Sequence, residues 1–80
     1  MPPPSWIVKR VLLGPGTVRR AAARQVTDER ERWMLRQPLE VRRSFVREVL
    51  EKGVNEEAWM LLQPEEVRQS YVKEVLERDR

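Results

Sequence analysis

The stretch ERWMLRQPLEVRRSFVREVLEK, residues 31–52, returns as EAWMLLQPEEVRQSYVKEVLER at residues 57–78. The two copies pair without a gap, and 15 of the 22 paired positions are identical. Three further pairs exchange similar side chains, such as Phe45 for Tyr71. Self-similarity of this kind indicates a repeated structural unit. The sequence therefore predicts a tandem duplication.

Each copy has the pattern of a short helix, a tight corner and a longer helix. The dipeptides Gln37-Pro38 and Gln63-Pro64 stand between two stretches of helical apolar spacing. Proline suits the first position of a helix, and it disfavours the α conformation at the preceding glutamine. We therefore expect the longer helices over residues 38–52 and 64–78, and an all-α fold.

Apolar residues recur along the longer helices at intervals of three and four, which places them on one face. Trp33 and Trp59 can be read as binding hot spots, but we favour core anchors that lock each short helix onto a longer one. Ser44 and Ser70 are expected as small residues where helices cross. The predicted repeat core comprises Trp33, Val41, Phe45, Val49, Leu50, Trp59, Val67, Tyr71, Val75 and Leu76.

The helix ends carry recognisable signals. Gly53 suits the left-handed position that ends a helix, and Asn55 suits the cap that starts the next one. Thr27 is expected to play the same part before Asp28 and Glu29. These ends divide one compact domain into a head (residues 1–27), a first helical hairpin unit (28–53) and a second helical hairpin unit (54–80).

The head contains its own start and stop signals for helices. A proline-rich lead precedes a short helix expected over residues 6–13 and capped by Ser5, and Gly14-Pro15-Gly16 forms a loop. Thr17 is expected to cap a further helix that starts at residue 18 and can continue through Trp33. Eight residues do not form a stable helix alone in water, so residues 6–13 must dock on something. The helical body is favoured over a membrane surface for this docking.

Composition limits the chemistry available. The 80 residues include no cysteine and no histidine, which removes disulfides, thiolate metal ligands and the commonest general base. No hydroxyl has a recognisable base, and the glutamates fit caps and solvated helix faces, so we expect no enzyme, catalytic residue, metal or cofactor. No apolar run is long enough to span a bilayer and no secretory signal is recognised, so cytoplasm is the default location.

A small protein-interaction module, an adaptor or regulatory subunit, is the leading functional hypothesis. Two short hairpins are not expected to bury all of their apolar side chains, so some would face another protein or a second copy. The candidate interface residues are Trp6, Leu35, Leu39, Leu61 and Leu62.

Nucleic-acid binding is the alternative. The net charge of +3 is unevenly distributed, because every charged residue of the head is positive and the rest of the chain is slightly acidic. Such unopposed charges can contact phosphates or an acidic partner protein. The candidate contacts are Lys9, Arg10, Arg19, Arg20 and Arg24.

Overall fold

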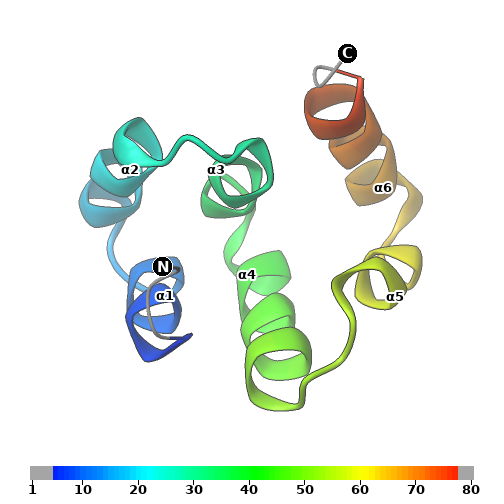
Figure 1. The fold of residues 1–80 in the computed structure, drawn as a ribbon, viewed down its shortest axis with the longest axis horizontal. Helices are drawn as coiled ribbons and strands as arrows, with labels where there is room; N and C mark the ends of the chain where they lie inside the picture. The colour runs from blue at the N-terminus through cyan, green and yellow to red at the C-terminus, as the bar shows by residue number, and fades with distance from the viewer. Residues whose placement is uncertain (1–4, 78–80) are drawn as a thin grey trace.

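The computed structural model of the protein describes residues 5–77, with side chains from Val8 onward, and its regular elements there are all helices. This confirms the all-α prediction. Three helix pairs follow one another across the molecule (Figure 1). The helices are α1 (Ser5–Leu12), α2 (Gly16–Gln25), α3 (Glu29–Leu35), α4 (Leu39–Phe45) with its continuation η1 (Val46–Glu51), α5 (Glu56–Leu61), and α6 (Glu65–Tyr71) with its continuation η2 (Val72–Leu76).

Proline and glutamine build the corner in both units. Pro38 and Pro64 are extended N-cap residues with ψ of 159° and 154°, one position outside the helix start that we predicted. The side-chain amides of Gln37 and Gln63 donate to the carbonyls of Trp33 and Trp59 at 3.0 and 3.1 Å. Each glutamine thereby adds a second hydrogen bond to a carbonyl that also accepts from the backbone amide three residues further along.

Both long helices widen in their second half. The amide of Lys52 donates to the carbonyl of Arg47 at 3.1 Å, and that of Glu77 donates to Val72 at 2.9 Å, so these bonds span five residues. Such wide turns are uncommon in helices. The first long helix then ends at Gly53, whose φ of 78° confirms the predicted left-handed conformation.

The predicted caps are partly correct. Asn55 accepts hydrogen bonds from the amides of Glu57 and Ala58, as expected. The prediction for Thr27 is wrong, because Asp28 is the cap and accepts from the amide of Arg30 at 2.8 Å. A carboxylate that reaches the amide two positions on satisfies the same unpaired donor group.

The head also differs in detail from its prediction. Its second helix, α2, begins at Gly16 after the cap residue Pro15, two residues before the predicted start. The prediction that Thr17 caps this helix is therefore wrong, because Thr17 lies within its first turn. Helix α2 ends at Gln25, and Val26 is extended with ψ of 141°, so the helix does not continue through Trp33. The proline-rich lead and residue 78, the predicted end of the last helix, lie outside the described residues.

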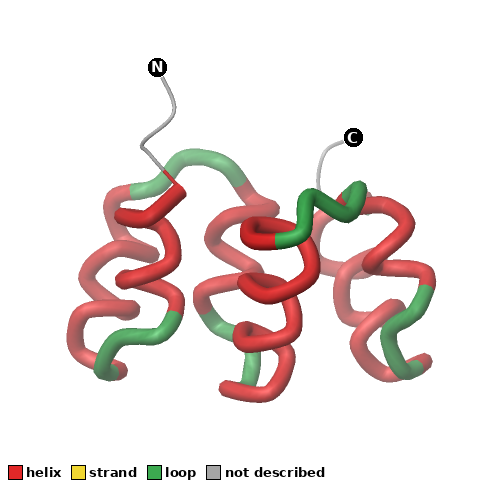
Figure 2. Tube along the Cα trace, turned by 90° about the horizontal axis from the view of Figure 1, so that it is seen from below, coloured by secondary structure: helices red, strands yellow, loops and turns green. Residues whose placement is uncertain are grey.

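One core joins the head and both units, and the three helix pairs stand side by side around it (Figure 2). Most predicted core residues are buried or partly buried in it. Leu76 is the exception, because it is exposed whereas its counterpart Leu50 packs against the core. Helix α1 contacts η1 in the first unit, whereas η2 is contacted by α3. The buried apolar residues are Leu12, Trp33, Met34, Leu35, Val46, Trp59 and Val75.

Gly53 provides a test of this backbone. A Cβ atom at Gly53 would meet nothing within 4 Å, so Gly53→Ala should cost only the left-handed conformation, about 1 kcal/mol of unfolding free energy. Gly53→Asn should cost less, because asparagine tolerates this conformation. Urea unfolding followed by circular dichroism measures both, and an unchanged Gly53→Ala midpoint would contradict the assigned helix end.

Candidate interaction surface

The two units are joined by an exchange of equivalent contacts. The indole NH of Trp33 donates to the hydroxyl of Ser70 at 3.0 Å, and that of Trp59 donates to Ser44 at 3.0 Å. Each tryptophan therefore bonds to the long helix of the other unit. The expected anchoring role of Trp33 and Trp59 agrees with their burial, whereas Ser44 and Ser70 act as hydrogen-bond acceptors and are more than small residues at a crossing.

Aromatic contacts follow the same exchange. The rings of Trp33 and Tyr71 lie 5.2 Å apart and those of Trp59 and Phe45 lie 5.3 Å apart, each pair edge to face at 77°. Burial raises the pKa of Tyr71 above its ordinary value. The face of each unit that carries its tryptophan, serine and long-helix aromatic residue is thus occupied by the other unit.

A second exchange joins the head to the first unit through two arginines. The Arg19 guanidinium donates to the carbonyl of Leu35 at 3.1 Å, and the Arg42 guanidinium donates to the carbonyl of Leu12 at 2.6 Å. Leu12 and Leu35 are the last residues of α1 and α3. Each arginine therefore binds the C-terminal end of a short helix in the other part.

The guanidinium of Arg42 is buried, and its hydrogen bonds to carbonyls at helix ends offset the cost of burying its charge. Its remaining bond goes to the carbonyl of Gln37 at 2.9 Å, just before the corner proline. Helix C-termini carry partial negative charge, which favours a cation there. Burial lowers the pKa of Arg42, and the charges of Arg19 and Arg43 lower it further, yet arginine keeps its charge at neutral pH.

The correspondence between Arg19 and Arg42 has a signal in the sequence outside the 22-residue repeat. Residues 15–26, PGTVRRAAARQV, pair without a gap with residues 38–49, PLEVRRSFVREV, and with 64–75, PEEVRQSYVKEV. Pro15 is an extended cap like Pro38 and Pro64. The head thus carries a sequence similar to that of the long helices. The identical positions between the first two stretches are Pro15, Val18, Arg19, Arg20, Arg24 and Val26.

This pairing identifies the counterparts of the buried face in the second unit. Leu35 and Val46 are 6% and 2% exposed, whereas their counterparts Leu61 and Val72 are 73% and 43% exposed. Leu76 is 51% exposed. The second unit therefore leaves open the face that the first unit buries against the head.

We call this area the open face and define it by Leu61, Leu62, Arg68, Val72 and Leu76. Arg68, Val72 and Leu76 follow one another at intervals of four along one helix side. Leu62 is 81% exposed at the corner that precedes them.

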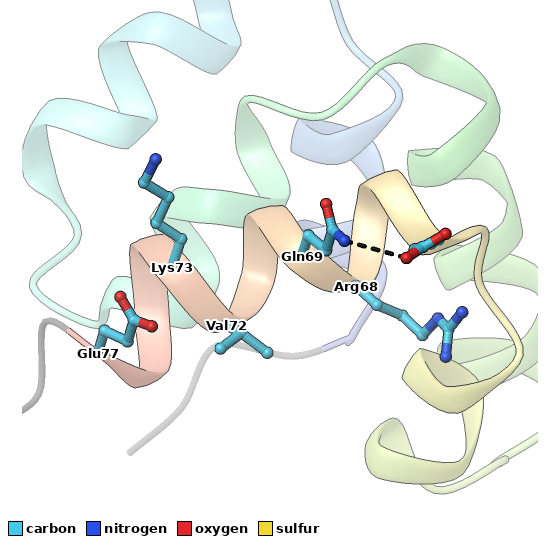
Figure 3. A pocket seen from close by; sticks show the side chains of 6 residues that line it. Arg68, Gln69, Val72, Lys73 and Glu77 are labelled. Atoms are coloured by element: carbon cyan, nitrogen blue, oxygen red, sulfur yellow. Dashed lines mark hydrogen bonds between the residues drawn. The ribbon is translucent and has the colours of Figure 1, made fainter.

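A shallow groove shares Arg68 and Val72 with the open face. Gln69 donates to the carboxylate of Glu65 at 3.1 Å in this groove, and Arg68 and Val72 lie on neighbouring turns (Figure 3). The lining residues are Glu65, Arg68, Gln69, Val72, Lys73 and Glu77.

The apolar interface candidates from the sequence fall into different environments. Leu61 and Leu62 lie on the open face. Leu39 is exposed on the first unit. Leu35 is 6% exposed beside the head and contributes to the surface only as part of the lining of a groove on α2. Trp6 lies in α1, but its side chain is outside the described part of the chain.

The basic candidates are also divided by the structure. Lys9 forms an ion pair with Glu51 at 2.6 Å, and Arg10 is exposed on the same helix. Arg19, Arg20 and Arg24 line a second groove on α2. Arg36, which we did not single out, joins them there, together with Ala23 and Leu35.

Comparison of the chain with protein-family models, with curated proteins and with solved structures found no match. Among the described residues, no three acidic, histidine or cysteine side chains gather closely enough to hold a metal ion. Within residues 5–77 no helix combines the length and apolar character needed to cross a bilayer. The open face and the groove on α2 are the two surfaces of the described chain that are suited to binding.

Arg42 can be tested against its neighbour on the same helix. Arg42→Met should lower the free energy of unfolding by about 2 kcal/mol, because buried carbonyls lose a charged donor. Arg43→Met should change it by less than about 0.5 kcal/mol, since Arg43 is exposed. Chemical denaturation of both variants measures the difference, and equal stabilities would show that the Arg42 bonds contribute nothing.

Proposed function

We propose that the protein is a small protein-interaction module, an adaptor or regulatory subunit, that binds its partner through the open face. The observation that carries this proposal is the exposure of apolar residues whose counterparts in the first unit are buried. Within the described chain, Leu61, Leu62, Val72 and Leu76 of the open face are exposed to solvent.

Exposed apolar side chains are ordinary when they are scattered, but a contiguous group marks a binding surface. Leu61 and Leu62 adjoin the corner that leads into α6, and Val72 and Leu76 follow on the same long helix. Arg68 and Lys73 beside them supply charge that can orient a partner. This combination of an apolar centre and a charged rim is typical of protein interfaces.

Site-specific cross-linking tests this function. Leu62 is replaced by the photoreactive residue benzoylphenylalanine in the cells that make the chain, and Arg47, exposed on the first unit, is replaced in the matched control. We expect irradiation to join a protein, identified by mass spectrometry, to the Leu62 variant and not to the Arg47 variant. Equal labelling of both, or of neither, would count against an interface at the open face.

The groove on α2 favours a second candidate function, the binding of a polyanion such as a nucleic acid. Arg19, Arg20, Arg24 and Arg36 line it without an acidic residue among the lining side chains. Arg19 is already bonded to the carbonyl of Leu35, so Arg20 and Arg24 are the principal candidate contacts. Clustered arginines suit phosphate oxygens.

Binding to fluorescent single-stranded and duplex nucleic acid at two salt concentrations tests this candidate. Binding through this groove should weaken by about 0.7–0.9 log unit per log unit of salt for each phosphate contact. It should be lost in the Arg20→Ala, Arg24→Ala double variant and kept in Arg47→Ala. Absence of binding at low salt would remove this candidate and leave the interaction module unaffected.

A further inference from the structure

We infer that the partner of the open face is the open face of a second copy of this chain, so that the protein forms a two-fold symmetric dimer. This inference rests on the function proposed above and names its partner. It follows from the way in which the first unit buries the same face against the head.

The contact between the head and the first unit is reciprocal. Arg19 of the head binds the end of α3, and its counterpart Arg42 binds the end of α1. Equivalent residues thus make the same contact in both directions, which is the pattern of a two-fold interface between identical subunits. A face that pairs with a face of similar sequence inside the chain has a geometry suited to pairing with itself.

The second unit keeps the residues that this contact needs. Arg68 corresponds to Arg42, and Leu61 corresponds to Leu35, whose carbonyl accepts from Arg19. In the dimer, Arg68 of each copy donates to the carbonyl of Leu61 at the end of α5 in the other. Val72 and Leu76 then pack in the positions that Val46 and Leu50 occupy in the first unit.

Charge also favours a second copy over a different partner. The groove of the open face is lined by two acids, Glu65 and Glu77, and two bases, Arg68 and Lys73. A surface with balanced charge can be complementary to itself across a two-fold axis. The corresponding groove on α2 has four arginines and would repel its own copy.

The corner residue of the second unit points to the same conclusion. The charged Arg36 of the first unit corresponds to Leu62, which is 81% exposed. Arg36 forms an ion pair with Glu74 at 3.7 Å within the chain, whereas the leucine side chain offers only apolar surface. Replacement of a charged corner residue by leucine enlarges the apolar area available to a second copy.

Sedimentation equilibrium of the purified full chain from about 1 µM to 1 mM tests the inference. We expect a mass that rises toward twice the 9.6 kDa of the chain. Leu61→Glu and Val72→Glu should give monomers of unchanged helicity, whereas Leu13→Glu, at an exposed leucine of the head, should leave association intact.

A substitution of Arg68 tests the arginine contact of the proposed dimer. Arg68→Met should raise the dimer dissociation constant about a hundredfold, because two symmetric charged hydrogen bonds are lost, and Arg43→Met should not change it. Monomers at every concentration, or a dimer that survives Leu61→Glu and Val72→Glu, would overturn the inference. A monomeric chain whose Leu62 cross-links to a different protein would retain the interaction module and reject self-association, whereas a monomer without a specific cross-link would reject both.

Discussion

The exchange of tryptophans between the two units is the contact on which the rest of the structure depends. Trp33 reaches Ser70 and Trp59 reaches Ser44, so each short helix is held by the long helix of the other unit. Helices of six or seven residues are unstable alone in water. Their stability here comes from docking, and the docking surface is always supplied by another part of the chain.

The head is attached to the first unit by a different kind of contact. It has alanines where the units have serine and an aromatic residue, at Ala21 and Ala22, so it cannot repeat the tryptophan contact. It is held instead by arginines at helix ends. The head covers Leu35 and Val46 of the first unit. The equivalent residues of the second unit, Leu61 and Val72, stay exposed.

Local signals in the sequence allowed much of the fold to be predicted. The helices were predicted from the spacing of apolar residues, and the corners from Pro38 and Pro64. Gly53 and Asn55 correctly indicated where the first long helix ends and where α5 starts. We recognised no sequence signal for the wide turns of η1 and η2. Thr27 and Asp28 are both suitable cap residues for α3, and the sequence did not distinguish between them. Leu61 and Leu62 of the open face were among the predicted interface candidates, but the sequence could not separate them from Leu35, whose burial depends on contact with the head. Only the motif Pro-x-x-Val-Arg in the head, at Pro15–Arg19, pointed toward that contact.

The link between the two units, residues 52–55, has a consequence for the strength of the contact that they share. Two reciprocal faces on separate molecules would have to meet by diffusion and lose translational freedom. A tether this short holds them at an effective concentration on the order of millimolar or above. A contact too weak to persist between separate molecules can therefore remain closed within one chain, with Gly53 setting the direction in which the tether leaves the helix.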